Sequence, residues 1–156
     1  MALQIGDKAP AFGLYNPEKK KITLEDQKGK NVLLLFFPLA FTSVCTAELC
    51  SVRDNIAAYN SANAVVYGIS VDSPYTLGKF KEEQHLNFDL LSDFNKEVSE
   101  KYDSLYPTFS LEMRGVSKRA AFVIDQEGVI RYAEVLENAG DVPDFNQINQ
   151  TLAGLR

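Results

Sequence analysis

Hydrophobic and polar positions divide the chain into segments with two different periods. Residues 30–37 and 64–71 are nearly continuous apolar runs, a pattern typical of strands that are buried on both faces of a sheet. Over residues 42–59 the apolar positions instead recur at steps of four and three, which predicts a helix with one buried face. The positions of that stripe are Cys45, Leu49, Val52, Ile56 and Tyr59.

Shorter signals predict the remaining elements. The sequence Asp72-Ser73-Pro74 has a capping residue followed by proline, and it predicts a helix that runs to about residue 84. Short strands are expected near residues 12–15 and 21–23, a short apolar stretch spans residues 88–91, and helices are expected over 94–102 and 143–155. Residues 119–125 and 129–135 flank a turn at Gln126-Glu127-Gly128, so they predict a β-hairpin.

This order of elements predicts the fold class. A strand–helix–strand unit, a further helix, an antiparallel hairpin and a closing helix give an α/β protein with a central mixed β-sheet flanked by helices, which is the arrangement of the thioredoxin fold. The 156 residues contain no internal repeat and no Pro/Gly-rich linker. We therefore expect residues 1–156 to form a single domain with one hydrophobic core.

Composition and charge exclude several classes of function. The net charge of −5 argues against binding to nucleic acid or to anionic membranes. The longest apolar run is far shorter than a membrane span, and the N-terminal residues lack the pattern of a secretory signal, so we expect a cytoplasmic protein. Two cysteines and one histidine cannot supply a tetrahedral zinc site, and we expect neither a metal nor another cofactor.

The most informative residue for function is Cys45. It follows the apolar run 30–37 and lies near the predicted N-terminus of the helix over residues 42–59. A helix N-terminus presents unpaired N–H groups and a partial positive charge, both of which favour a thiolate over a thiol. Because the thiolate is the nucleophilic form, this placement predicts a reactive cysteine rather than a structural one.

The residues around Cys45 resemble those of a known family. Pro38, Thr42 and Cys45 form the sequence P-x-x-x-T-x-x-C, and Arg119 lies where the peroxiredoxins carry a catalytic arginine. Residues 31–50, 65–72 and 119–135 all resemble that family. Within it, the run 45–50 and the short chain are similar to the bacterioferritin-comigratory and AhpE-like groups, although Ser43-Val44 replaces the Gly or Pro-Gly that usually precedes the cysteine.

This resemblance implies a thiol-dependent peroxidase that reduces hydrogen peroxide and organic hydroperoxides. Cys45 would be the peroxidatic nucleophile, which peroxide converts to a sulfenic acid. Thr42 and Arg119 would be hydrogen-bond donors in the pocket, and the rigid ring of Pro38 would exclude water from it. The resemblance also implies a thioredoxin- or glutaredoxin-type reductant, no bound cofactor, and a monomer or a homodimer.

Cys50 has two interpretations. It is the provisional resolving cysteine, which would form an intramolecular disulfide with Cys45. Alternatively, it is a packing residue of the helix, and an external thiol reduces a one-cysteine enzyme. Five residues along a helix separate two Cα atoms by about 8.6 Å, beyond the limit of roughly 7 Å for a disulfide without backbone movement.

Other charged residues near the motif have plainer expectations. Arg119 could form an ordinary surface ion pair, with Lys118 and Arg114 as the alternative cations. Glu48 lies three residues after Cys45 and could face the rim of the pocket, but we expect it to be an exposed first-turn carboxylate that complements the helix dipole. We expect His85 to be a surface helix residue. Thr42 is also a candidate N-cap.

Two other functions use the same residues. A thiol–disulfide oxidoreductase of the same fold would carry C-x-x-C, whereas this chain has C-x-x-x-x-C, so the spacing argues against it. A non-catalytic peroxide sensor would change partners when its helix is oxidised. It would undergo a single stoichiometric oxidation, whereas an enzyme would turn over with a reductant.

We predict that formation of a Cys45–Cys50 disulfide locally unfolds the chain around residues 42–52, because an intact helix holds the two residues too far apart. Amide hydrogen exchange over these residues should be faster in the disulfide form than in the reduced form. Equally slow exchange in both forms would contradict this prediction.

Overall fold

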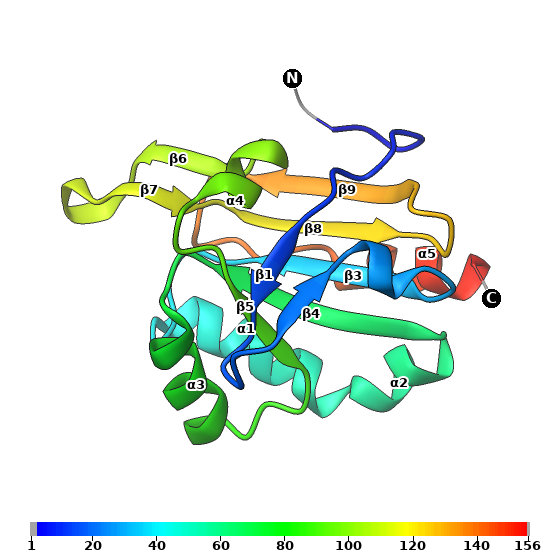
Figure 1. Cartoon of the computed structure of the whole chain (residues 1–156), viewed down its shortest axis with the longest axis horizontal. Helices are drawn as coiled ribbons and strands as arrows, with labels where there is room; N and C mark the ends of the chain where they lie inside the picture. Colours follow the sequence, from blue (N-terminus) through cyan, green and yellow to red (C-terminus); the bar gives the residue numbers. More distant parts are fainter. Residues whose placement is uncertain (1–2, 156) are drawn as a thin grey trace.

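The computed structural model describes residues 3–155 and contains one large mixed sheet with helices on both faces (Figure 1). The strand order is β2-β1-β5-β4-β3-β8-β9, and β6 and β7 form a separate two-stranded sheet. The strands are β1 (Gly13–Tyr15), β2 (Lys21–Thr23), β3 (Asn31–Phe36), β4 (Ala64–Ser70), β5 (Asp89–Ser92), β6 (Leu105–Thr108), β7 (Arg114–Ser117), β8 (Arg119–Ile124) and β9 (Ile130–Leu136). The helices are α1 (Ser43–Asp54), α2 (Ile56–Ser61), α3 (Pro74–Glu83), α4 (Glu97–Lys101) and α5 (Phe145–Gly154), with 3-10 turns at Glu25–Gln27 and Ser110–Glu112.

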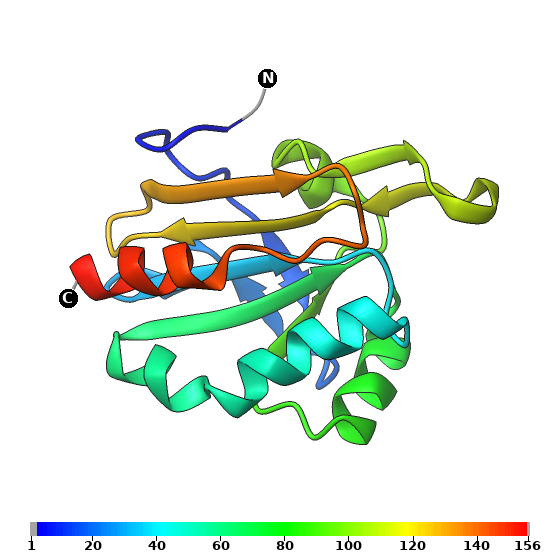
Figure 2. The ribbon, with the colours of Figure 1, turned by 180° about the vertical axis from the view of Figure 1, so that it is seen from behind.

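The two faces of the sheet bury two apolar clusters. Figure 2 shows α1, α2 and α5 on one face, where buried residues of these helices and of α3 pack against alternate residues of β3 and β4. On the other face, the N-terminal segment and α4 cover Val32, Leu34 and Phe36 of β3. Because β3 is covered on both faces, every one of its residues is buried, which explains its continuous apolar run.

The register of the central strands decides which residues meet at one edge of the sheet. β3 and β4 are parallel, whereas β3 and β8 are antiparallel, with Phe36 opposite Ala120. The first residue of β8, Arg119, therefore lies beside the end of β3, where the chain leaves the sheet and enters α1. Two segments far apart in the sequence are thus brought together by strand pairing.

Most predicted elements are confirmed, but the long helix over residues 42–59 is interrupted. α1 ends at Asp54, and Asn55, with φ −116° and ψ 17°, separates it from α2, which begins at Ile56. The side-chain amide of Asn55 donates to the carbonyl of Ser51 at 2.9 Å, a local bond of the kind that competes with regular helix geometry. The buried stripe nevertheless continues into α2, where Tyr59 is buried.

The helix predicted over residues 94–102 is shorter and begins at Glu97. Lys96 has the left-handed φ of 68°, and the Asp93 carboxylate accepts hydrogen bonds from the backbone N–H groups of Val98 and Ser99 at 3.1 and 2.6 Å. The carboxylate thus accepts hydrogen bonds from N–H groups that would bond to carbonyls of a preceding turn if the helix began earlier.

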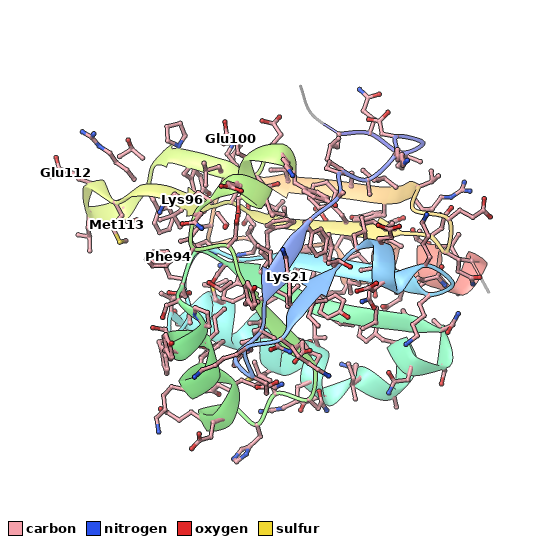
Figure 3. The ribbon with its side chains drawn as sticks, viewed as in Figure 1. Lys21, Phe94, Lys96, Glu100, Glu112 and Met113 are labelled. Atoms are coloured by element: carbon pink, nitrogen blue, oxygen red, sulfur yellow. The ribbon has the colours of Figure 1, made fainter. Side chains whose placement is uncertain are left out.

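The hairpin of β6 and β7 was not predicted, because its residues lack a regular apolar alternation. Lys96 lies close to this hairpin (Figure 3), and its side chain passes within 2.5 Å of where a Cβ at Gly115 would be. Gly115 has φ +71°, a left-handed backbone conformation that favours glycine, whereas the flexible end of the Lys96 side chain could move away from a Cβ. None of the helices described for residues 3–155 combines the length and apolar character that a membrane-crossing helix needs.

Gly68 of β4 allows α1 to pack closely on the sheet. A Cβ at this position would lie 2.8 Å from Leu90 Cδ2, 3.3 Å from Phe37 Cε1 and 3.7 Å from Leu49 Cδ2.

We predict that Gly68→Ala lowers the free energy of unfolding by about 1–3 kcal/mol because it overpacks the core, as measured by urea denaturation. Gly154→Ala is the matched control, because a Cβ there meets nothing within 4 Å, and it should be neutral or slightly stabilising in α5. A Gly68→Ala protein as stable as the wild type would contradict the prediction.

Candidate active site

The Cys45 thiol lies where β3 leads into α1. Cys45 is the third residue of α1, and its side chain is buried. Thr42 is the N-cap residue with an extended backbone, and Phe41 before it has a left-handed φ of 68°. Pro38, also buried, is the second residue after the end of β3. The sulfur is therefore held in the first turn of a helix, beside the backbone donors of its N-terminus.

The Asp72 side chain fixes the loop that leads into α1. Its carboxylate Oδ2 accepts a hydrogen bond from the backbone N–H of Ala40 at 2.7 Å and another from the Ser70 hydroxyl at 2.7 Å. Asp72 follows β4, so the carboxyl end of one strand holds the loop that leaves the neighbouring strand. Nothing in the sequence indicated the bond from Ala40 to Asp72, because Asp72-Ser73-Pro74 indicated only the start of a helix.

The Arg119 guanidinium contacts the Cys45 sulfur. Its Nη2 donates to Cys45 Sγ at 3.1 Å, and its Nη1 donates to Glu48 Oε1 at 2.6 Å. Nε and Nη2 also donate to the backbone carbonyl of Ala139 at 3.2 and 2.9 Å. Only 1% of Arg119 is exposed, so the alternative of an ordinary surface ion pair does not apply.

The expectation that Glu48 is an exposed carboxylate is wrong. Glu48 is buried, with 2% of its surface exposed, and it forms an ion pair with Arg119. Its second oxygen, Oε2, has no hydrogen-bond partner among the residues that the structure describes. Burial raises the pKa of Glu48 to about 7, although the charge and the hydrogen bond of Arg119 act in the opposite direction. The alternative, in which the spacing of three residues from Cys45 turns Glu48 toward the pocket, agrees with this orientation, because positions i and i+3 share a helix face.

The Thr42 hydroxyl does not make the expected capping bond. Thr42 is the N-cap residue by position, but its side chain accepts no hydrogen bond from the helix. The hydroxyl instead donates to the carbonyl of Leu39 at 2.8 Å, and within residues 3–155 it has no hydrogen bond to the Cys45 sulfur. The oxygen of Thr42 retains its capacity to accept a hydrogen bond, and the side chain is exposed at the entrance to the site.

Cys50 lies on a different side of α1 from Cys45 and contacts the end of α3. Both cysteines are free thiols, and Cys50 is half-buried. Cys50 Sγ lies 3.5 Å from Gln84 Oε1. In the next turn of α1, Arg53 Nη1 donates to the Gln84 carbonyl at 2.6 Å, and Asn87 Nδ2 donates to the Arg53 carbonyl at 3.2 Å. We call these contacts of Cys50, Arg53, Gln84 and Asn87 the α1–α3 latch.

The other candidate residues lie away from the thiol. Lys118 pairs with Glu137 at 2.8 Å, and Arg114 is exposed on β7. His85 is exposed, as expected, but it lies beyond the end of α3 with a left-handed φ of 52° rather than within a helix. In the part of the chain that the structure describes, no three His, Cys, Asp or Glu side chains are close enough to hold a metal ion.

The arrangement favours nucleophilic chemistry at sulfur. A guanidinium remains charged at all physiological pH values, and here it donates directly to the sulfur within a buried site. Such a contact stabilises a thiolate and any negative charge that develops beside it. The sequence alone did not identify two partners of the guanidinium, the Glu48 carboxylate and the Ala139 carbonyl. The Ala139 carbonyl had no signal at all, because a backbone carbonyl is present at every position.

Comparison with known proteins identifies relatives along most of the chain. Residues 5–133 match the AhpC/TSA family. A putative peroxiredoxin bcp from Coxiella burnetii is 40% identical over 132 residues, which cover 83% of this chain and 87% of the relative. The alkyl hydroperoxide reductase E of Mycobacterium tuberculosis is 37% identical over 156 residues, 98% of each chain. The crystal structure of peroxidoxin BcpB from Mycobacterium tuberculosis superimposes with a TM-score of 0.87 at 27% identity over 99% of both chains.

The buried Glu48 makes stability depend on pH. Its pKa is about 7 in the folded protein against an ordinary value of 4.5, so between these values the folded state binds more protons than the unfolded state. The free energy of unfolding of the reduced protein should therefore fall as pH rises through this window, by about 3 kcal/mol from this group. Glu48→Gln should remove that part of the slope in urea denaturation measured at several pH values.

Glu82→Gln is the control for this measurement, because Glu82 is an exposed residue of α3. It should retain the wild-type slope. Parallel pH profiles for Glu48→Gln and the wild type would contradict the assignment.

Proposed function

Because the chain belongs to the AhpC/TSA family, the peroxiredoxins, it is a thiol-dependent peroxidase, and we propose that Cys45 is the residue that its peroxide substrate oxidises. The observation that supports this most strongly is the 3.1 Å contact between Arg119 Nη2 and Cys45 Sγ. A buried sulfur with a fixed cation as its direct hydrogen-bond donor is an environment that favours the nucleophilic thiolate.

The reaction is a displacement at oxygen. The Cys45 thiolate attacks one oxygen of the peroxide, so that an S–O bond forms and the O–O bond breaks. Sulfur is oxidised to a sulfenic acid, and the leaving hydroxide or alkoxide takes up a proton to become water or an alcohol. The charge of Arg119 and the N–H groups at the start of α1 stabilise the negative charge as it moves from sulfur to the leaving oxygen.

Thr42 and Pro38 have supporting roles in this proposal. The Thr42 hydroxyl donates its hydrogen bond to the Leu39 carbonyl. Its oxygen can therefore accept a hydrogen bond from the O–H of a bound peroxide. Pro38 has no backbone N–H and is buried beside the loop, where its ring excludes water.

The entrance to the site suits organic hydroperoxides as well as hydrogen peroxide. The Phe41 ring is 49% exposed and packs edge-on against Phe80 of α3, with 5.1 Å between the ring centroids. Phe41 directly precedes Thr42, so an apolar surface lies next to the proposed peroxide-binding hydroxyl. Such a surface stabilises the apolar part of an alkyl hydroperoxide.

In the same proposal, Cys50 attacks the sulfenic acid of Cys45 and forms the disulfide. The α1–α3 latch controls when Cys50 can leave its position in the helix. The Gln84 contacts to Cys50 and Arg53 must break before the helix around Cys50 can unwind toward Cys45. A thioredoxin- or glutaredoxin-type protein in the cytoplasm would then reduce the disulfide. The chain could act as a monomer or as a homodimer, and the proposed chemistry requires only one copy.

The test is mass spectrometry of the wild type, Cys50→Ser and Cys45→Ser after one equivalent of peroxide. We expect an intramolecular Cys45–Cys50 disulfide in the wild type and a dimedone-reactive sulfenic acid on Cys45 in Cys50→Ser, because the resolving thiol is missing. Cys45→Ser, the control, should lose peroxide consumption by at least 100-fold, since the nucleophile is removed. Sustained turnover with thioredoxin, thioredoxin reductase and NADPH should require Cys45.

Three outcomes would change the proposal. Wild-type peroxide consumption by Cys45→Ser would exclude Cys45 as the nucleophile. A sulfenic acid that persists in the wild type, together with turnover driven by small thiols, would favour a one-cysteine enzyme. A single oxidation that no reductant reverses would favour a peroxide sensor.

A further inference from the structure

Cys45 and Glu48 share a single positive charge, that of the Arg119 guanidinium. Arg119 is the donor to both Cys45 Sγ and Glu48 Oε1, at 3.1 and 2.6 Å. Each of the three residues is at most 2% exposed. An uncompensated charge in such a place costs several kcal/mol. The site therefore favours one negative charge to balance one guanidinium, although two acidic groups are available to carry it.

Among residues 3–155, Arg119 is the only cation that forms an ion pair with Glu48. Cys45 faces it from its own helix α1, Arg119 from β8, and the Ala139 carbonyl shares the guanidinium from the loop after β9. Lys118, which precedes Arg119 in the chain, forms an ion pair with Glu137. A carbonyl oxygen carries partial negative charge, so it opposes ionisation of Glu48 rather than favouring it.

The two oxygens of the Glu48 carboxyl group have different surroundings. Oε1 receives a short hydrogen bond from Arg119, whereas Oε2 is buried and has no partner among residues 3–155. A carboxylate would place half of its charge on that unpartnered oxygen, while a neutral carboxyl group would not. Burial already raises the pKa of Glu48 to about 7, and a thiolate on the same guanidinium would raise it further.

We propose that the negative charge of this cluster passes from Cys45 to Glu48 when peroxide oxidises Cys45, so that Glu48 releases the proton that the reaction consumes. This inference rests on the proposed function, in which the Cys45 thiolate becomes a sulfenic acid. Before the reaction the cluster holds a guanidinium, a thiolate and a neutral Glu48. After it, the cluster holds a guanidinium, a neutral sulfenic acid and a Glu48 carboxylate.

Atoms and charges balance in this scheme. The thiolate and ROOH give the sulfenic acid and RO⁻, and RO⁻ takes up one proton to become ROH. Glu48 gives up one proton to solvent, so the enzyme and substrate together take up none. The buried cluster stays neutral throughout, and Arg119 retains an ionised partner. Glu48 is thus a positioning residue that acts through Arg119.

The test is a proton count during a single turnover. Cys50→Ser protein, in which the sulfenic acid persists, is mixed with one equivalent of hydrogen peroxide at about pH 8 in weak buffer with a pH indicator. The thiolate on the shared guanidinium raises the pKa of Glu48 further above its ordinary value than burial alone, which raises it to about 7. At this pH the carboxyl group is therefore neutral before oxidation and ionises once the sulfur is neutral. Proton uptake per sulfenic acid should be well below one with Glu48 present and about one in Cys50→Ser/Glu48→Gln.

Three further measurements separate the possible causes of the observed proton uptake. Cys50→Ser/Glu82→Gln removes an exposed carboxylate of α3 and should behave like Cys50→Ser alone. The ultraviolet absorbance of thiolate, recorded before peroxide is added, should show that Cys45 is ionised. The infrared band of a protonated carboxyl group should disappear on oxidation of Cys50→Ser, a measurement that does not depend on whether the Glu48→Gln variant folds.

The failures of the two proposals are distinguishable. Absence of a dimedone adduct on Cys45 would overturn the proposed function. A Cys45 sulfenic acid accompanied by uptake of a full proton with Glu48 present would overturn only the charge transfer to Glu48. A neutral Cys45 thiol beside an ionised Glu48 in the reduced protein would also overturn it, because the charge would then lie on Glu48 from the start.

Discussion

The burial of the Arg119 guanidinium is the constraint on which the site depends. A permanently charged group inside a protein needs partners for its N–H donors and a counter-charge. Its partners come from two segments: Cys45 and Glu48 of α1, and the Ala139 carbonyl after β9. The position of α1, the start of β8 and the loop that precedes α5 are therefore mutually dependent. Without the guanidinium, two buried acidic groups would face each other with no cation.

If Cys50 resolves the sulfenic acid as proposed, the helix that carries both cysteines has to be stable and yet able to open. Its buried stripe of Cys45, Leu49 and Val52 fixes it to the sheet, while Arg53 and its Gln84 contact hold its far end to α3 by only a few polar bonds. Polar contacts at a partly exposed surface contribute much less than buried apolar packing. A local opening of α1 is consistent with this division, since the sheet beneath it can remain intact.

The sequence allowed much of the fold to be predicted, because the buried strands and helices carry clear periods. The strands at residues 30–37 and 64–71, the helix start at Ser73 and the hairpin of β8 and β9 all appear in the structure. The errors arose where local chemistry replaced periodicity. Asn55 interrupts a helix whose apolar stripe continues, and the hairpin of β6 and β7 has no stripe to detect. Glu48 was misjudged because a carboxylate in a first helical turn is usually exposed, and its burial depends on an arginine 71 residues away.

By itself, the sequence determined the identity of the chemical groups: a thiol at a helix N-terminus, a hydroxyl three residues before it, and an arginine at the start of a later strand. Only the tertiary structure decided how these groups meet. The antiparallel pairing of β3 and β8 brings Arg119 to the sulfur, and the packing of α1 turns Glu48 inward. The Leu39 carbonyl accepts the hydrogen bond that the Thr42 hydroxyl donates. The physical reason is that a side chain's charge state and hydrogen-bond partners depend on neighbours that are close in space and distant along the chain.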